Sequence, residues 1–376
     1  MGKETLSRTT YKSAVKRYVT TRGSVTVKAE QQARKTGKLH QLVDPAGYGA
    51  IRRSLPRFEQ EDNSLWGLTV GTPIPIETRV DTTGSMGDNV DVALRVLPDA
   101  YELWSMMLPG YDLQIATGIF GDIQDNFVLC RPQFEMTAEK IVEQLTLMVP
   151  ERDGGDRDED PHYGLFGSAY LTSAYINKIS LKGYDFTVSD APARDWLDER
   201  QLRRIYSEEV FEKVIENGHQ MNTQSLPTTK EIVQDLLKRA HAFFLQVESA
   251  QDTTKFWAKI FGPERVVVLP STELLPQVQA AIIGLTEGTI DLQQVEEFLQ
   301  QNNVNTSDAR SITRSVANIP IRAQANLPNF NKRPQKGDLF NEKTDLWPIG
   351  SEETISSDDV PEEKPKPTKP NGITWL

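Results

Sequence analysis

Short apolar runs alternate with amphipathic segments between residues 72 and 303. The apolar runs have the length of buried strands, and we expect strands at residues 76–80, 112–123, 126–131, 184–189, 241–247 and 265–269. The amphipathic segments carry apolar residues at helical spacing, and we expect helices at residues 88–108, 137–148, 163–179, 198–217, 229–240, 254–261, 273–285 and 292–300. Strands and helices therefore alternate over most of the chain.

This alternation predicts an α/β fold with a doubly wound, mostly parallel sheet that helices cover on both faces. Several strands read as continuous apolar runs, as parallel strands buried on both faces do. We expect the short strand at 126–131 to pair antiparallel with its predecessor at the edge of the sheet. The fold should resemble the Rossmann arrangement, in which loops at the carboxyl ends of the strands form a crevice.

The two flanks lack this periodicity. Residues 1–71 are predicted to be a basic, largely extended N-terminal arm, with a short strand at 24–27 and a polar helix at 28–38. Residues 72–303 are predicted to form the domain, including its closing C-terminal helices. Residues 304–376 are polar and rich in proline, and we expect a flexible tail there.

Composition narrows the class of protein. Hydrophobic residues make up 38% of the chain and mean hydropathy is -0.47, so part of the chain should pack poorly. Cys130 is the single cysteine, which excludes a disulfide framework and a cysteine-based zinc site. No stretch approaches the roughly 20 apolar residues of a membrane span, and the first residues lack the apolar core of a signal peptide. We expect a soluble, cytoplasmic protein.

Charge is distributed unevenly. The net charge is -11, yet residues 1–60 hold 13 Lys and Arg against 4 Asp and Glu. Tyr11, Tyr18 and Tyr48 lie among these cations, and aromatic rings between cations suit stacking on single-stranded nucleic acid. The same arm could equally lie on the acidic body of its own chain. We favour packing on the body, because basic segments without a motif are weak evidence for nucleic-acid binding.

The strongest candidate chemistry lies in a tight loop. Asp81, Thr83 and Ser85 occupy alternate positions after the strand at 76–80 and before the helix at 88–108. All three offer hard oxygen atoms, which are the ligands that small divalent cations prefer. Capping of the following helix is the simpler interpretation, since Asp and Ser are common N-cap residues.

Two further loops carry oxygen ligands that the fold would bring to the same edge. Residues 150–161 contain six carboxylates within 12 positions, including Asp156 after two glycines. Asp190 ends the strand at 184–189. In a doubly wound sheet the carboxyl ends of neighbouring parallel strands converge, so both loops can meet Asp81. Capping does not explain three convergent loops.

The sequence from Asp81 to Ser85 resembles the metal-ion-dependent adhesion site of von Willebrand factor type A domains, in their intracellular bacterial or phage-like form. The resemblance covers about residues 72–288 and leaves out both flanks. It implies a metal site whose ligands are Asp81, Thr83, Ser85, Asp156 and Asp190. Two departures are evident: Asp153, Asp158 and Asp160 compete with Asp156 for the second-loop position, and residues 197–240 are longer than a simple connection.

Hydroxyl and carboxylate ligands without His or Cys favour Mg²⁺, with Mn²⁺ or Ca²⁺ as substitutes. The resemblance implies a non-enzymatic adaptor or scaffold that coordinates an Asp or Glu of a protein partner, in some relatives an AAA+ ATPase or a multi-protein assembly. One alternative is a nucleic-acid-associated protein acting through residues 1–60. Another is a metal-dependent phosphohydrolase, for which His162 is the histidine nearest the acidic loop.

Overall fold

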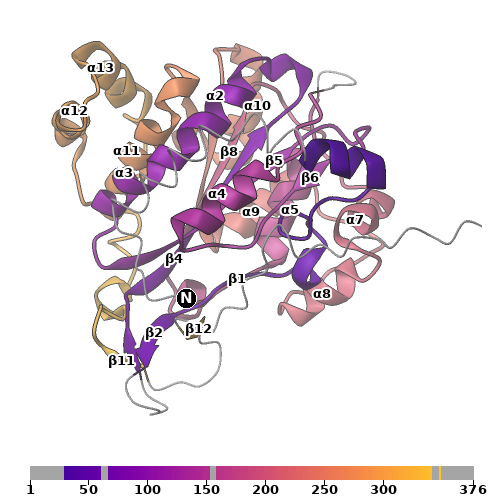
Figure 1. The fold of residues 1–376 in the computed structure, drawn as a ribbon. Coiled ribbons are helices and arrows are strands. Elements are labelled where there is room, and N and C mark those ends of the chain that lie inside the picture. The colour runs from indigo at the N-terminus through magenta and orange to yellow at the C-terminus, as the bar shows by residue number, and fades with distance from the viewer. Residues whose placement is uncertain (1–28, 61–66, 153–157, 341–346, 349–376) are drawn as a thin grey trace, which may run out of the picture.

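The computed structural model describes residues 29–60, 67–152, 158–340 and 347–348 of the 376-residue chain. At its centre is a six-stranded sheet with the order β10-β9-β8-β4-β5-β6 (Figure 1). Its strands are β4 (Thr72–Asp81), β5 (Tyr111–Phe120), β6 (Leu129–Cys130), β8 (Gly183–Ser189), β9 (Ala240–Gln246) and β10 (Val266–Val268). All neighbours are parallel except β6, which pairs antiparallel with β5 at the edge. The predicted fold class is therefore confirmed.

Helices cover both faces of this sheet (Figure 1). One face packs against α2 (Asn89–Val96), α3 (Ala100–Met107) and α11 (Leu275–Glu287), and the other against α5 (Pro161–Tyr170), α9 (Thr229–Leu237) and α10 (Gln251–Phe261). The remaining α-helices are α4 (Ala138–Thr146), α6 (Tyr175–Lys178), α7 (Glu199–Tyr206), α8 (Val210–Glu216), α12 (Leu292–Gln301) and α13 (Thr306–Ser315). The 3-10 helices are η1 (Gly47–Gly49), η2 (Gly84–Met86), η3 (Leu97–Asp99), η4 (Pro263–Arg265), η5 (Thr272–Leu274) and η6 (Phe330–Lys332). None of the helices within the described ranges combines the length and apolar composition that a membrane crossing requires.

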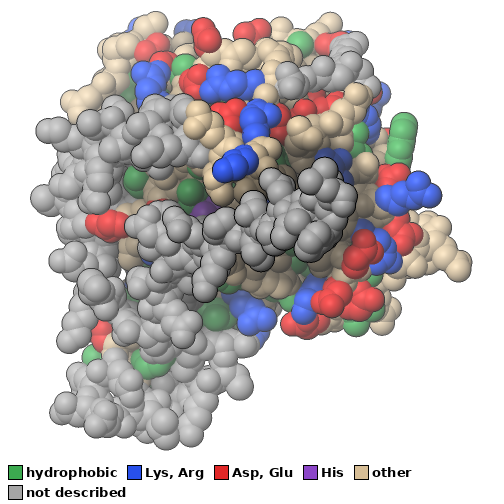
Figure 2. Space-filling view, turned by 45° about the vertical axis from the view of Figure 1, so that its right-hand side comes forward, with side chains coloured by type: hydrophobic (Ala, Val, Ile, Leu, Met, Phe, Trp, Pro, Cys, Tyr) green, Lys and Arg blue, Asp and Glu red, His purple; other side chains and the backbone are tan. Residues whose placement is uncertain are grey.

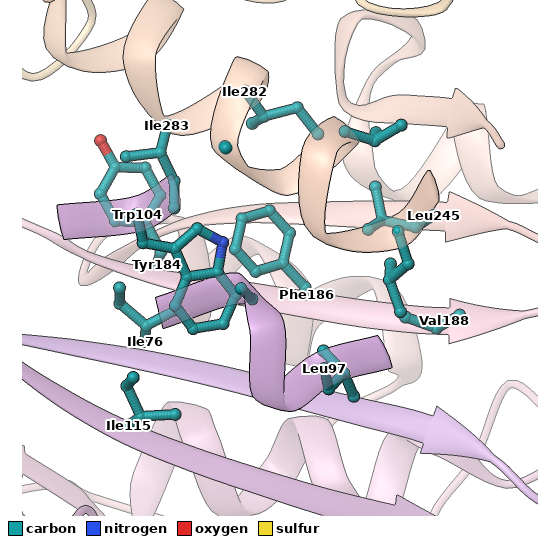
Figure 3. Close-up of a cluster of buried hydrophobic side chains, with 14 of the residues drawn as sticks. Ile76, Leu97, Trp104, Ile115, Tyr184, Phe186, Val188, Leu245, Ile282 and Ile283 are labelled. Atoms are coloured by element: carbon teal, nitrogen blue, oxygen red, sulfur yellow. The ribbon is translucent and has the colours of Figure 1, made fainter. Parts of the chain in front are cut away.

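The apolar core lies between the sheet and the α3–α11 pair. Ile76 of β4 and Phe186 of β8 point toward Trp104 of α3 and toward Ile282 and Ile283 of α11 (Figure 3). These five side chains are at most 1% exposed. Side chains alternate between the two faces of a strand, so every second residue of β4 and β8 contributes to this core.

The opposite face of the same strands carries a buried polar layer. Arg79 of β4 donates two hydrogen bonds to Asp185 of β8, with Nη1–Oδ1 and Nη2–Oδ2 distances of 2.6 and 2.5 Å. Glu77 accepts from Arg131 Nε at 2.9 Å and from the Ser168 hydroxyl of α5 at 2.9 Å. All of these groups are buried, and each buried charge has an opposite partner, as burial in a low dielectric requires.

Three expected helices are divided in the structure, among them the predicted helix at 198–217, which forms α7 and α8. The predicted helix at 88–108 is α2 and α3 separated by η3, which contains Pro98, and a proline inside a helix removes a backbone donor. The predicted helix at 163–179 ends as α5, and the chain then forms β7 (Thr172–Ala174) and α6. Strand β7 pairs in parallel with β1 (Arg52–Ser54), a segment more than 100 residues earlier. Local periodicity holds no information about such a distant partner.

The described part of the N-terminal arm packs on the body and contains helix and strand as well as irregular segments. A helix spans residues 29–36 within the predicted 28–38, whereas the predicted strand at 24–27 lies outside the described residues. Arg52 is 1% exposed and donates to the backbone carbonyls of Asp44, Pro45, Gly47, Arg131 and Pro132. Arg57 forms a buried ion pair with Asp112. Both arginines therefore act inside the fold.

Packed structure also continues past the predicted domain boundary at residue 303. Helix α13 buries Ala309 and Ile312 against the core, and Gln324 is completely buried. A small second sheet then joins both flanks in the order β11-β3-β2-β12. Its strands are β2 (Arg57–Gln60), β3 (Gly67–Thr69), β11 (Leu339–Phe340) and β12 (Trp347–Pro348). The rest of the predicted tail, residues 349–376, lies outside the described residues.

Candidate metal centre

Four of the five predicted site residues meet at the carboxyl end of the central sheet. Asp81 is the last residue of β4, and Thr83 and Ser85 follow in the turn that contains η2. Strand β8 is the parallel neighbour of β4, and Asp190 directly follows it. The convergence that the doubly wound topology predicts for these loops is therefore present in the structure.

A chain of hydrogen bonds links these side chains. Asp81 Oδ1 accepts from the Thr83 hydroxyl at 2.7 Å and from the Thr83 backbone amide at 2.9 Å. The Ser85 hydroxyl donates to Asp190 Oδ1 at 2.9 Å, and it lies 3.3 Å from the Thr83 hydroxyl. The Ser189 hydroxyl donates to Asp81 Oδ2 at 2.6 Å. The sequence placed Ser189 at this edge but gave it no role, and the structure shows that it orients Asp81.

The fifth predicted residue, Asp156, lies outside the described residues, as does its competitor Asp153. From the same loop the structure describes Asp158, which is exposed, and Glu159 and Asp160, which are buried. Glu159 was not among the predicted ligands. It is 2% exposed, and its Oε2 atom has no hydrogen-bond partner among the residues that the structure describes.

Electrostatics place Glu159 beside the first loop. Burial, followed by the negative charge of Asp81, raises the pKa of Glu159 to about 9, and a hydrogen bond with Thr83 opposes this rise. The pKa of Asp81 is raised to about 6 by burial, against hydrogen bonds from Ser189 and Thr83. Burial also raises the pKa of Asp190. No described positive side chain is among the causes of the pKa shifts of Glu159 and Asp81, and a bound cation would stabilise these carboxylates.

The competitor Asp160 is already paired. Its Oδ2 atom accepts from Arg194 Nη1 at 2.5 Å and from the Ile123 amide at 2.6 Å, while Arg194 Nη2 reaches Asp122 at 3.1 Å. The backbone of Glu159 is bonded on both sides, donating to the Pro192 carbonyl at 3.0 Å and accepting from the Arg194 amide at 3.2 Å. The residues that directly follow Asp190 therefore fix the backbone of Glu159, and the charge of Asp81 acts on its carboxyl group.

The donor set fits a hard divalent cation only if the hydroxyls take part. Within the described ranges no group of three or more His, Cys, Asp or Glu side chains is placed to hold a metal by itself. The oxygen atoms of Asp81, Thr83, Ser85 and Asp190, which hydrogen bonds join, would supply ligands that Mg²⁺ accepts, and the charge of Asp81 acts on Glu159 next to them. The unpartnered Glu159 Oε2 is the observation that favours this arrangement over simple helix capping.

His162 is poorly placed to act as a general base on a substrate that enters from solvent. The side chain is 1% exposed, and burial, followed by the charge of Arg194, lowers its pKa to about 3. Its ring lies against Tyr163, with the centroids 4.4 Å apart. The imidazole is therefore neutral at pH 7 and enclosed.

No known protein-family profile and no curated protein matches the chain. Similar solved structures include the pilus adhesin SpaC of Lactobacillus rhamnosus GG, with 13% identity and a TM-score of 0.38 over 60% of this chain. The vWF domain of the type V pili tip protein Mfa5 of Porphyromonas gingivalis aligns over 59% of this chain with 10% identity and a TM-score of 0.38. A von Willebrand factor type A structure from Catenulispora acidiphila aligns over 58% with 11% identity and a TM-score of 0.31.

The alignments span 32% of the SpaC adhesin, 97% of the Mfa5 domain and 44% of the Catenulispora protein. Because these identities and TM-scores are low, the alignments carry no argument here. The α/β fold class rests on the strand order alone. That strand order, with its one antiparallel edge strand, is consistent with a von Willebrand factor type A-like fold.

Proposed function

We propose that this chain is a non-enzymatic protein-binding module that acts through a divalent cation, most favourably Mg²⁺. Asp81, Thr83, Ser85, Asp190 and Glu159 would hold the ion. A bound cation supplies an open coordination position that an Asp or Glu of a protein partner can occupy. The observation that carries the proposal is the buried, unpartnered Glu159 Oε2 beside the hydrogen-bonded loop of Asp81.

The protein's own groups prepare the site. Ser189 fixes Asp81 through its hydroxyl, and the Ser85–Asp190 hydrogen bond ties the first loop to the end of β8. Gly84 and Ser85 are exposed, whereas Asp81 and Glu159 are buried. The arrangement therefore presents Ser85 to solvent, and a partner would approach from the side of Ser85. An AAA+ ATPase or a component of a multi-protein assembly remains our proposed class of partner.

The nucleic-acid alternative receives less support. Arg52 and Arg57 of the N-terminal segment are buried in internal contacts, and Arg34 pairs with Glu30 and Glu151. On the face shown in Figure 2, acidic and basic side chains lie interspersed among the coloured residues. Phosphate backbones are bound by clustered cations. The phosphohydrolase alternative is disfavoured because His162 is enclosed and its pKa, lowered to about 3, makes it a weak base.

The test is calorimetric titration of Mg²⁺ into the full chain and into matched variants. We expect Asp81→Asn to weaken Mg²⁺ binding at least 100-fold and Ser85→Ala to weaken it about tenfold, since each removes a ligand. Asp88→Asn is the control, because Asp88 is exposed at the start of α2 and its side chain makes no capping hydrogen bond. Mg²⁺ binding that survives Asp81→Asn would contradict the proposal.

The absence of catalysis is tested separately. Release of phosphate from p-nitrophenyl phosphate should stay at the background rate with Mg²⁺ or Mn²⁺. Turnover that disappears in Asp81→Asn would instead establish the phosphohydrolase.

A further inference from the structure

Exposed carboxylates lie around the candidate metal centre, and two of them belong to the loops that form it. Asp88 is exposed and follows Ser85 by three residues, so their Cα atoms are at most roughly 11 Å apart. Asp158 is exposed and directly precedes the buried Glu159. Each of the two loops therefore places a negative charge in solvent close to the centre.

Two more carboxylates come from the segment that joins β9 to α10. Glu248 is exposed and lies two residues past the β9 residue that pairs with Ser189. Burial and, more weakly, the charge of Glu248 raise the pKa of Asp190. Asp252 is exposed and directly precedes Thr253, whose hydroxyl donates to the Asp190 carbonyl at 3.2 Å. We name four exposed residues the acidic rim: Asp88, Asp158, Glu248 and Asp252.

Two arginines at the same edge are already engaged. The Arg152 amide donates to the Thr82 carbonyl at 3.1 Å, and the Arg152 guanidinium donates to both oxygens of Asp91 at 2.9 and 3.0 Å. The Arg194 guanidinium is shared between two buried aspartates. These cations therefore leave little positive charge for the acidic rim.

The charges around the centre decide what can approach it. In the described part of the chain, no positive side chain is among the causes of the pKa shifts of Asp81, Glu159 and Asp190. A bound Mg²⁺ would offset two of these three carboxylate charges, and the acidic rim would remain. A partner's carboxylate that approaches alone is repelled by the rim, whereas cations beside that carboxylate are attracted.

We infer that the partner of this centre is a basic protein segment that presents one Asp or Glu between Lys or Arg side chains. The carboxylate would bind the metal, and the cations would lie at the acidic rim. The inference rests on the proposed function and adds the class of partner to it. Complementary charges of this kind raise the association rate and select the partner more than they add affinity. The same rim repels nucleic acid and uniformly acidic proteins.

The test measures anisotropy of three fluorescein-labelled peptides with the full chain in 10 mM Mg²⁺. The first peptide has a glutamate with two lysines on each side, the second has serines in place of the lysines, and the third has glutamine in place of the glutamate. One exposed pair of opposite charges changes affinity by a factor of roughly 1.5–5. The lysine–glutamate peptide should therefore bind about tenfold tighter than the serine–glutamate peptide in about 50 mM NaCl.

Salt and the third peptide separate the two parts of the interaction. In about 0.5 M NaCl the preference for lysines should fall below about threefold, because the Debye length shortens to about 4 Å. The lysine–glutamine peptide should bind at least about tenfold more weakly than the lysine–glutamate peptide, because it offers no carboxylate to the metal.

Variants of the chain test the acidic rim itself. The double variant D88N/E248Q removes half of the rim charge and should reduce the tenfold preference for lysines to about threefold. Calorimetry should find Mg²⁺ binding within about twofold of that of the natural chain. The matched control E212Q/E297Q removes two exposed carboxylates from α8 and α12, which lie away from α2 and α10 (Figure 1), and should keep the preference.

Several results would overturn the inference. These are equal affinity for the lysine–glutamate and serine–glutamate peptides, no binding of the lysine–glutamate peptide, or a preference that D88N/E248Q leaves at tenfold. Tighter binding of a labelled single-stranded oligonucleotide, or a doubled sedimenting mass in Mg²⁺ that Asp81→Asn reverses, would assign the centre to a different occupant.

Failure of the inference can be told apart from failure of the proposed function. If Asp81→Asn abolishes Mg²⁺ binding while the two glutamate peptides bind equally, the inference fails and the proposed function stands. If Mg²⁺ does not bind, or if the glutamate and glutamine peptides bind equally, the proposed function fails and the inference fails with it.

Discussion

Replacing Glu159 with Gln should stabilise the metal-free protein, although the substitution removes a proposed ligand. The pKa of Glu159 rises from 4.5 to about 9 on folding because the carboxyl is buried beside Asp81. The folded chain therefore binds a proton at pH 7 that the unfolded chain releases. A carboxyl with a raised pKa lowers the stability of the fold as pH rises from 4.5 toward 9.

The size of the effect follows from the pH interval. Between pH 4.5 and pH 7 the penalty reaches about 3 kcal/mol, at 1.36 kcal/mol for each pH unit. Gln has the shape of the protonated acid and carries no such penalty. In EDTA at pH 7 we expect E159Q to unfold at higher urea, by up to about 3 kcal/mol, and the difference should shrink below about 1 kcal/mol at pH 5.

Mg²⁺ should reverse the order of stability of the natural chain and the E159Q chain. For a site with a dissociation constant of about 0.1 mM, 10 mM Mg²⁺ stabilises the natural chain by about 2.7 kcal/mol. The E159Q chain should gain less, because the amide is a weaker ligand. Urea denaturation followed by circular dichroism, with and without EDTA, measures both effects, and D158N is the control because Asp158 is the exposed neighbour. The reasoning is refuted if E159Q is less stable in EDTA at pH 7, or if its effect does not change with pH.

Three further predictions concern the scaffold. Burial raises the pKa of Glu287 to about 7, so Glu287 should contribute up to about 3 kcal/mol to the fall in stability between pH 4.5 and 7, and E287Q should remove that contribution in urea melts. Asp185→Asn removes the closer carboxylate partner of the buried Arg79 and leaves only Glu77, 3.7 Å away, so it should cost about 3–5 kcal/mol in urea denaturation; a milder loss in the double variant R79M/D185L would show that the poorly compensated charge is the cause. Trp104→Ala empties the centre of the core and should cost about 3–5 kcal/mol by thermal denaturation, whereas a loss under 1 kcal/mol would show that the core collapses into the space.

The sheet could be predicted from the sequence because short apolar runs identify its strands without information from distant segments. The apolar runs marked every central strand, and alternation with helices indicated parallel pairing. The predicted strand began at Ile76 because Pro73 and Pro75 argued against an earlier start. In the structure, β4 begins at Thr72. Pairing with β8 begins only at Ile76, so these prolines lie where β4 has β5 as its partner and no pairing with β8.

The candidate site was predictable where its geometry is set by one loop or one strand end. Asp81, Thr83, Ser85 and Asp190 follow directly from such positions. Glu159 was missed because six carboxylates share its loop, and the choice among them depends on the distant Pro192 and Arg194 backbone. The packed flanks were missed for a related reason, since β1, β3 and β11 gain their partners from segments far away in the sequence.

The buried ion pair between Arg79 and Asp185 has a consequence for how this fold could diversify. A slip of one residue between β4 and β8 would turn Asp185 away from Arg79, so the pair fixes the alignment of the two strands. Asp81 and Ser189 at the strand ends follow that alignment, and the hydrogen bond between them adds to it. The residues at the strand ends could therefore be exchanged for others, by natural drift or by engineering, while the frame beneath keeps its geometry. In this fold the residues of the candidate site and the buried ion pair that fixes the strand register are separate sets of residues.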